Sequence, residues 1–184
     1  AGEVHRARPD GYTLIFQSPT SGVTGPLTRR VPPFDPVTGF SHVSILGITP
    51  IVLAVGLHMG VGNLREFVAK VRAEPGRHSY GSSGIGGGPH LSIELLRIRA
   101  GGLDMIHVPY RGAGPAIQDI LAGNVAFIPD TFTPLLPQHR AGAMKIISVF
   151  GEERSPVAPE IMTAKEEGFD VVTRIANYLS APPG

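Results

Sequence analysis

The stretch from Tyr80 to Leu96 constrains the fold more than any other part of the sequence. It reads YGSSGIGGGPHLSIELL, in which a glycine-rich run opens directly onto a segment patterned as a helix. Proline suits the first helical turn, where Pro89 stands, because its missing N–H would have had no intrahelical partner there. A helix start presents unpaired N–H donors and the positive end of the helix dipole, and glycines let a ligand approach them. The stretch predicts a strand-to-helix turn that holds an anion, with a turn that serves only packing as the alternative.

Two common anion-binding motifs are excluded at this turn. A dinucleotide fingerprint counted from Gly84 and Gly86 would need Gly or Ala where the sequence has Pro89. A P-loop would need Gly-Lys followed by Ser or Thr, and the sequence contains no such triplet. What remains is a pair of serines, Ser82 and Ser83, and bare backbone amides, which suit a carboxylate.

Composition excludes several classes of protein. At 184 residues and a formal net charge of +1, the chain can bury a substantial core and shows no basic stripe for nucleic acid. Cysteine is absent, which excludes disulfides, thiolate metal sites and cysteine nucleophiles and suits an exported bacterial protein. The longest apolar run, residues 45–57, is interrupted and shorter than the roughly 20 residues that span a bilayer. Residues 1–11 show no signal peptide, so we expect a processed or trimmed piece.

Hydrophobic periodicity and turn signals predict many short elements. The clearest helix is residues 63–71, where Asn63 can cap and Glu66 stands three residues on, as in a capping box. Further helices are expected at residues 91–100, 115–122, 135–140 and 163–167, the last also opening with a capping box. Strands are expected at residues 12–16 (buried), 43–48, 51–55, 78–80, 105–108, 125–128, 144–149, 171–175 and 178–181. From residue 60 onward helix and strand alternate, which indicates an α/β fold with a mostly parallel sheet.

Polar residues recur at the ends of predicted strands. They follow Phe16, Tyr80, Val108 and Ile128. A doubly wound sheet brings successive strand ends to one edge, where ligands bind, so the recurrence indicates a binding edge. Each position also has an ordinary alternative: the hydroxyl-rich loop 17–25 as a Ser/Thr turn, and Arg111 as a solvated surface charge.

The chemistry of a hydrolase or a metal site is not supported by motif. No segment supplies G-x-S-x-G, so a serine hydrolase elbow is absent. His90 and Glu94 stand one helical turn apart, but two ligands fall short of the three that catalytic zinc sites supply. Asp130 could act as a general base, yet no partner carboxylate can be placed beside it, and His107 lies inside an apolar strand where a core role is usual.

Five blocks of the sequence together resemble one family. They are PDGYTL, PPFDPVTGF, YGSSGIGGGPHLSIELL, HVPYRGAGPAIQDILAGNV and RSPVAPEIMTAKEEGF, and they occur in the order and at the intervals of the Bug/TctC family. The members of this family are periplasmic solute-binding proteins of tripartite tricarboxylate transporters. The resemblance covers essentially the whole chain.

The resemblance implies a fold and a division into domains. It implies a two-domain, type II periplasmic-binding-protein fold of the Venus flytrap kind, with an incomplete first domain. Residues 1–57 would form a partial domain 1, residues 58–174 domain 2, and residues 175–184 a crossover strand returning to domain 1. The chain begins after the place of the family's first strand and Pro-Gly-Gly loop and stops before its closing helices, so we expect a core fragment.

Ligand-binding residues follow from the resemblance, position by position. They are Ser18, Thr20, Ser83, Gly84, Gly86, Gly87, His90, Tyr110, Arg111, Gly112, Asp130 and Thr131. Members usually carry small hydroxyl residues near Gly87 and Gly88, so backbone amides would have to replace some side-chain contacts here.

The leading hypothesis is a periplasmic binding protein that captures a small mono-, di- or tricarboxylate and delivers it to the membrane permease subunits of a tripartite transporter. It implies no enzymatic activity, no cofactor, no metal, no nucleic-acid partner and a monomeric state. One alternative is an enzyme that acts on a carboxylated or phosphorylated metabolite at the same strand ends. Another is a ligand sensor for a membrane kinase, which would use the same pocket.

Overall fold

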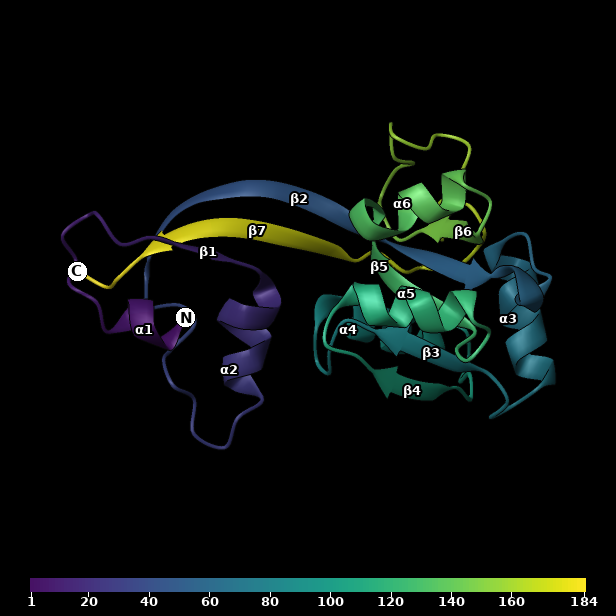
Figure 1. Ribbon diagram of the computed structural model, residues 1–184, viewed down its shortest axis with the longest axis horizontal. Coiled ribbons are helices and arrows are strands. Elements are labelled where there is room, and N and C mark those ends of the chain that lie inside the picture. Colours follow the sequence, from purple (N-terminus) through teal and green to yellow (C-terminus); the bar gives the residue numbers. More distant parts are fainter. The chain divides into compact units, whose positions relative to one another are not determined.

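The computed structural model describes residues 1–184, and its chain forms two compact units (Figure 1). The first unit comprises residues 1–49, 86–88 and 175–184, and the second comprises residues 50–85 and 89–174. The domain limits expected from the sequence stay a prediction.

Short elements dominate both units. The strands are β1 (Ile15–Gln17), β2 (Ser41–Gly56), β3 (Ser79–Ser82), β4 (Ile106–Pro109), β5 (Phe127–Thr131), β6 (Met144–Val149) and β7 (Arg174–Ala181). The helices are α1 (Gly2–His5), α2 (Gly25–Leu27), α3 (Leu64–Ala73), α4 (Gly88–Arg99), α5 (Ala113–Leu121) and α6 (Phe132–Arg140), with a π-helical turn η1 (Thr20–Thr24) and a 3-10 turn η2 (Leu57–Met59).

The sheet of the second unit is mixed. β3 pairs in parallel with β4 on one side and with β5 on the other, so Tyr80 lies between His107 and Phe127. β2 then pairs antiparallel with both β5 and β6. The parallel order expected from the sequence holds for β3, β4 and β5, and their carboxyl ends therefore share one edge of the sheet.

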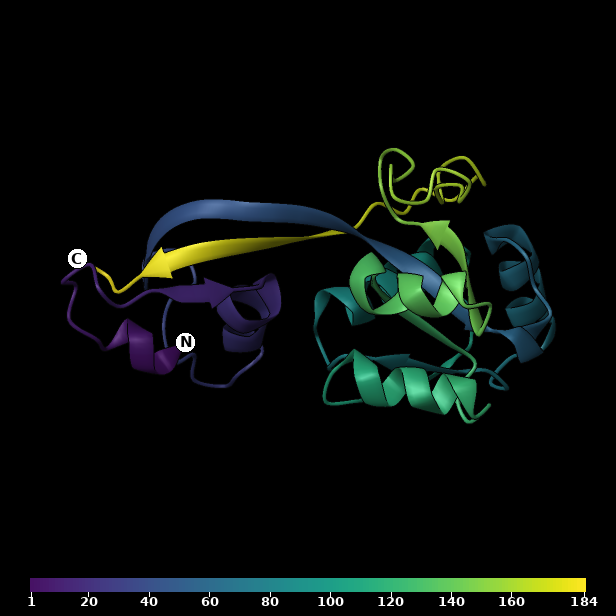
Figure 2. The same ribbon diagram turned by 45° about the horizontal axis from the view of Figure 1, so that its top comes forward.

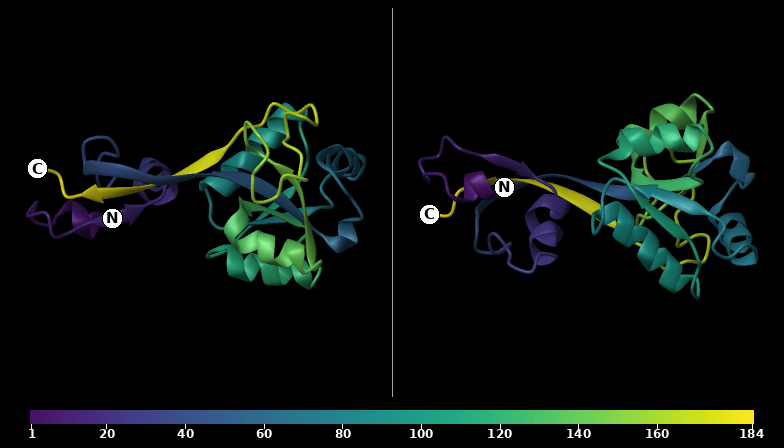
Figure 3. Two further views of the ribbon diagram at one scale, coloured as in Figure 1. Left: turned by 90° about the horizontal axis from the view of Figure 1, so that it is seen from above. Right: turned by 60° about the horizontal axis from the view of Figure 1, so that its bottom comes forward.

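Helices α4 and α5 cover opposite faces of this sheet (Figures 1 and 3). On the α5 face, a Cβ built on Gly81 would lie only 3.0 Å from the Cβ of Ala116, so glycine permits the close approach of helix and strand. On the α4 face, the hydroxyl of the neighbouring Tyr80 donates to Glu94 at 3.1 Å. Successive residues of β3 thus face the two helices in turn, as strand geometry requires.

Helix α3 closes the far side of the core. Asn63 accepts a hydrogen bond from the backbone N–H of Glu66 at 2.9 Å, which confirms the expected cap. The four apolar residues of the predicted face, Leu64, Phe67, Val68 and Val71, are all buried. The buried carboxylate of Glu167 accepts from the backbone N–H of Leu64 at 2.8 Å and so ties the loop before β7 to the start of the helix.

The first unit has a much smaller apolar core. β7 lies between β1 and β2, and β1 leads directly into η1 and α2 (Figure 2). Phe34 and Phe40 meet edge to face at 4.9 Å and are its only large apolar side chains that are buried, at 6% and 5% exposed. Tyr12 is 94% exposed and Phe16 62% exposed, so the prediction of a buried strand at residues 12–16 is wrong. The strand found is shorter and begins later, at Ile15.

Pro50 does not interrupt a strand, contrary to expectation. Residues 43–48 and 51–55 belong to one continuous strand, β2. Proline removes a single N–H donor, and its fixed φ is compatible with extended backbone, so the strand passes through it. Residues 174–181 likewise form one strand, β7, where two extended segments were expected.

A predicted helix at residues 163–167 is absent, although its capping contacts are present. The backbone N–H of Thr163 donates to Glu166 at 2.8 Å, and the backbone N–H of Glu166 donates to the Thr163 hydroxyl at 3.2 Å. Gly168, at a φ of 93°, turns the chain before a second helical turn can form. The hydroxyl-rich loop 17–25 is also different from expectation, because η1 and the start of α2 make it helical.

We expect the second unit to carry most of the stability. Leu53 is fully buried in β2, whereas Leu46 in the same strand is 56% exposed. Leu53→Ala should lower the free energy of unfolding by about 2–5 kcal/mol, since truncation leaves a cavity. The matched Leu46→Ala change should stay within about 0.5 kcal/mol. Urea denaturation measures both, and equal losses would contradict this assignment of the core.

Candidate functional site

Three strand-to-helix junctions lie at one edge of the second unit's sheet. β3 leads through a glycine-rich turn into α4, β4 through Tyr110–Gly112 into α5, and β5 directly into α6. Because β3, β4 and β5 are parallel neighbours, the three helices begin at the same edge. This is the arrangement that places ligands at strand ends in α/β sheets.

The starts of α5 and α6 leave backbone donors without side-chain caps. Gly112 is the N-cap of α5 and has no side chain to offer, and Thr131 is the N-cap of α6 but makes no capping hydrogen bond. The first N–H groups of a helix have no intrahelical partner, and the helix dipole is positive there. The edge therefore presents backbone donors that suit an anion.

Asp130 is the one buried carboxylate at this edge. It was expected to follow a strand but lies within β5, opposite Val52 of β2, and is only 7% exposed. Its Oδ1 accepts from the backbone N–H of Thr131 at 2.7 Å, while its buried Oδ2 has no hydrogen-bond partner. Burial raises the pKa of Asp130, and Thr131 and the nearby Ser83 hydroxyl act in the opposite direction.

Tyr110 is committed to the scaffold. Its hydroxyl donates to Asp119 of α5 at 2.5 Å, and its backbone N–H donates to the carbonyl of Ser82 at 2.9 Å. Burial, with a further contribution from Asp119, raises the pKa of Tyr110 to about 12. Its predicted role as a ligand contact stays a prediction, but these donors are already in use. Arg111, the next residue, is exposed and forms no ion pair or hydrogen bond through its side chain.

The glycine-rich turn needs its glycines for backbone conformation. Gly84 and Gly86 have φ angles of 148° and 72°, which side chains rarely adopt. Gly86 and Gly87 are grouped with the first unit, as is Gly88, where a Cβ would lie 3.2 Å from Ile175 of β7. His90 lies in the first turn of α4, and its ring stacks on that of His107.

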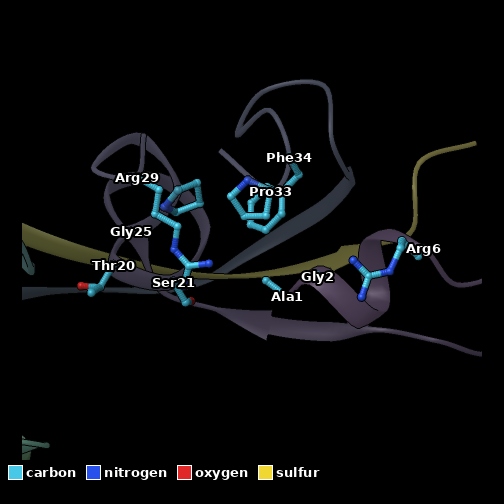
Figure 4. Close-up of a pocket in the computed structure, with 10 residues that line it drawn as sticks. Ala1, Gly2, Arg6, Thr20, Ser21, Gly25, Arg29, Pro33 and Phe34 are labelled. Atoms are coloured by element: carbon cyan, nitrogen blue, oxygen red, sulfur yellow. The ribbon is translucent and has the colours of Figure 1, made fainter. Parts of the chain in front are cut away.

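In the first unit, the predicted contacts Ser18 and Thr20 lie where β1 passes into η1. The Ser21 hydroxyl accepts from the backbone N–H of Ser18 at 3.2 Å and stabilises this turn. Thr20 and Ser21 line a pocket of about 450 Å³ (Figure 4). Its other lining residues are Ala1, Gly2, Arg6, Gly25, Pro26, Arg29, Pro33 and Phe34.

Arg29 and Arg6 give this pocket a positive lining that sequence reasoning missed. Figure 4 shows the Arg29 guanidinium near Ser21, while Arg6, the residue after α1, has its guanidinium near Gly2. Neither guanidinium forms an ion pair or hydrogen bond. The two residues stand far apart in the sequence, in no motif, so nothing in the sequence indicated that they share a pocket.

Other kinds of site are not found. No group of three or more His, Cys, Asp or Glu side chains is placed to hold a metal ion. Every helix is too short or too polar to cross a membrane.

Comparison with known families identifies the class of this chain. The model of the TctC family, the tripartite tricarboxylate transporter family receptor, matches residues 1–184. The chain belongs to this family.

Relatives match along most of this chain but only part of their own length. The chain is 32% identical over 178 residues to a UPF0065 protein in the gbd 5′ region of Cupriavidus necator. It is 29% identical over 166 residues to protein BugT of Bordetella pertussis. These matches cover 96% and 89% of this chain but 53% and 50% of the relatives, so the chain spans about half their length.

Solved structures of similar fold include proteins with bound carboxylates. The chain is similar to R. palustris Rpa4515 with adipate, at 29% identity and a TM-score of 0.93. It is also similar to MatC (Rpa3494) from Rhodopseudomonas palustris with bound malate, at 28% identity and a TM-score of 0.87. Both comparisons cover all of this chain, and 61% and 62% of those chains.

Two aspartates of the second unit, Asp130 in β5 and Asp119 in α5, should respond oppositely to pH. The pKa of Asp130 is raised above 3.8, so its contribution to stability is complete below that value and is lost as the pH rises through its folded pKa. Tyr110 and Asn124 lower the pKa of Asp119, so its contribution is present above 3.8 and is lost as the pH falls.

Thermal unfolding of Asp130→Asn and Asp119→Asn across acid and neutral pH tests this pair of assignments. Relative to the parent, Asp130→Asn should gain stability as the pH rises, and Asp119→Asn should lose it. If the difference in stability from the parent changed with pH in the same direction for both variants, Asp130 would not be held in a destabilising environment.

Proposed function

We propose that this chain is the ligand-capturing part of a periplasmic solute-binding protein for small carboxylates. The observation that carries the proposal is the convergence of the starts of α4, α5 and α6 at one sheet edge, with α5 and α6 lacking side-chain caps. Such donors bind a carboxylate through hydrogen bonds and the helix dipole. Membership of the TctC family and the adipate and malate complexes of similar proteins support the same ligand class.

Two types of group are proposed to contact the ligand: backbone amides and arginine side chains. Backbone amides of the glycine turn and of residues 112–114 hold one carboxylate, and Arg111, which has no partner in the protein, adds a positive charge. In the pocket of the first unit, Arg29 offers a guanidinium whose planar fork also matches carboxylate geometry.

The chain passes from one unit to the other in β2 and at the start of β7, and the proposal includes a closed form of the Venus flytrap kind. The ligand shifts the population toward the closed form only as far as its contacts favour that form. The closed, monomeric protein delivers the carboxylate to the permease subunits of a tripartite transporter.

Binding without turnover fits the state of the titratable groups. An enzyme at this edge would need an acid and a base within reach of each other, and the candidates are Asp130, His90 and His107. Asp130 Oδ1 accepts from Thr131 and His107 Nε2 is bonded to Ser82, so one polar atom of each side chain is already in use within the protein. Incubation with adipate or malate should return the acid unchanged while raising the melting temperature, and conversion of either acid would favour the enzyme.

Gly86 offers a direct test of the glycine turn. Its φ of 72° is a genuine outlier for a β-branched residue, so Gly86→Val should distort the turn and lower the affinity for adipate at least about tenfold. Gly47→Val is the matched control, because Gly47 lies in β2 with open space around it and no positive φ. Unchanged calorimetric affinity in Gly86→Val would remove the turn from the site.

Arg29 and Arg30 form a matched pair for testing whether the pocket of the first unit binds a carboxylate. Both are exposed, but only Arg29 lines the pocket. Arg29→Gln should weaken adipate binding about tenfold or more, as loss of a charge-assisted pair predicts. Arg30→Gln should leave the affinity unchanged, and equal effects of the two changes would indicate only a general loss of positive charge.

A further inference from the structure

An exposed loop of the first unit lies between two buried residues. The 27–33 loop has the sequence LTRRVPP, and each of its residues is exposed. Pro26 before the loop and Phe34 after it are both buried. Figure 1 shows the chain leaving the end of α2 and continuing as a loop below that helix. The loop therefore presents its side chains to solvent from a base that is packed into the unit.

Both ends of the 27–33 loop are held in place. At its start, the backbone N–H of Arg29 donates to the carbonyl of Pro26 at 3.1 Å. At its end, two consecutive prolines fix φ, and Phe34 packs against Phe40 in the small core of the unit. Because the loop is already ordered, it loses little conformational entropy when it binds a surface.

Two apolar side chains of this loop stand in water. Leu27 is 61% exposed and Val31 is 79% exposed. A single exposed apolar residue needs no explanation. These two, however, stand on either side of Arg29 and Arg30 in the sequence, so the loop combines apolar groups with adjacent positive charges.

The arginines of the first unit have no partner within the protein. No side-chain hydrogen bond or ion pair is formed by Arg6, Arg8, Arg29 or Arg30. Most arginines of the second unit, by contrast, bind a carboxylate or a backbone carbonyl: Arg65, Arg72, Arg97, Arg99, Arg140 and Arg154. Arg6 lines the same pocket as Arg29, so a third guanidinium lies beside the loop. The positive charges of this unit are therefore available to an external anion.

Few carboxylates oppose these charges. Residues 11–34 contain no Asp or Glu. Asp10 and Asp35, on either side of that range, both accept hydrogen bonds from backbone N–H groups that follow them. Glu3 of α1 is the other acid of the first unit. The loop itself thus carries two positive charges and no negative one.

We propose that the 27–33 loop docks the protein on the surface of an anionic phospholipid membrane. Arg30 binds lipid phosphates, whose geometry its planar fork matches, while Leu27 and Val31 enter the boundary between headgroups and acyl chains. The charges of Arg29 and Arg6 add to the attraction. The proposal does not depend on the proposed function, because Leu27, Arg30 and Val31 lie outside the proposed ligand contacts.

The pattern of the loop favours a membrane over a folded partner. The core of a protein–protein interface is apolar and depleted in charged residues. Here the arginines separate the two apolar side chains, so the loop cannot present a continuous apolar patch. A lipid interface accepts the mixture, since it offers phosphates and apolar chains within a few ångströms of each other.

Co-sedimentation with vesicles tests the docking directly. Vesicles of phosphatidylglycerol and phosphatidylcholine in equal parts should retain the protein at low salt, and vesicles of phosphatidylcholine alone should not. Raising the salt from about 0.01 M to about 1 M shortens the screening length from about 30 Å to about 3 Å and should release most of the protein. Equal retention by the two kinds of vesicle, or none by the anionic kind, would overturn the proposal.

Arg30 and Arg77 separate the loop from a general effect of positive charge. Arg30→Gln should lower the partition into anionic vesicles about fivefold, the contribution of one basic residue near such a surface. Arg77→Gln is the matched control, because Arg77 is exposed in the second unit and its side chain has no partner. Both variants should keep the melting temperature of the parent. Equal losses of partition in the two variants would contradict docking through the loop.

Val31 and Val37 test the apolar part of the contact. They are 79% and 77% exposed, but Val37 follows Asp35 and has no arginine beside it. Since the sequence contains no Trp, Val31→Trp and Val37→Trp each introduce a single fluorescent reporter. On anionic vesicles, the emission of Val31→Trp should shift to shorter wavelength and that of Val37→Trp should not. The same shift in both variants, or in neither, would refute insertion of the loop.

An acidic protein surface is the other partner that the charges of this loop fit. If the parent ignored anionic vesicles but bound an immobilised acidic peptide through Arg30, the proposal would be overturned in favour of such a partner. These measurements use no carboxylate ligand. Failure of the parent to bind adipate or malate would therefore reject the proposed function and leave the docking result unaffected.

Discussion

Parallel pairing of β3 with both β4 and β5 is the constraint on which the rest of this structure depends. It sends three consecutive strands to the same edge of the sheet, and each strand passes within a few residues into a helix. The strand order therefore brings the three helix starts together, and no single sequence motif is needed for it. On the face that α5 covers, Gly81 allows the helix to lie close to β3, because a side chain at this position would meet Ala116 of α5.

Two polar groups at this edge of the second unit's sheet lower the stability of the fold. Asp130 keeps one buried carboxylate oxygen without a partner, and His107 holds a ring between two others, where a charge is disfavoured. Buried groups of this kind are expensive unless they serve a purpose. Both lie beside the starts of α4 and α6, next to the backbone donors of these helices.

Local features of the chain could be predicted from the sequence, whereas long-range ones could not. Asn63, Pro89 and the apolar face of α3 act within a few residues of themselves, and their roles were evident. Pro50 was misjudged because the pairing of β2 with β5 and β6, not local propensity, keeps the strand continuous. The Thr163–Glu166 contacts formed as expected, but Gly168 stopped the helix that they would begin.

In the candidate site too, local features could be predicted from the sequence and long-range contacts could not. The recurrence of polar residues at strand ends was visible, and the parallel order of β3, β4 and β5 supports it. The Tyr110–Asp119 bond, the Ser82–His107 contact and the pocket shared by Arg6 and Arg29 join residues that no spacing rule connects. Such pairs emerge only from the tertiary fold.

Backbone amide resonances during an adipate titration would test the central claim most directly. The account predicts that the largest shifts occur at residues 83–88, 112–114 and 131–132, where the starts of α4, α5 and α6 meet. Shifts confined to other surfaces, such as the groove between Phe132, Leu136 and Val157 on the outside of α6, would contradict it.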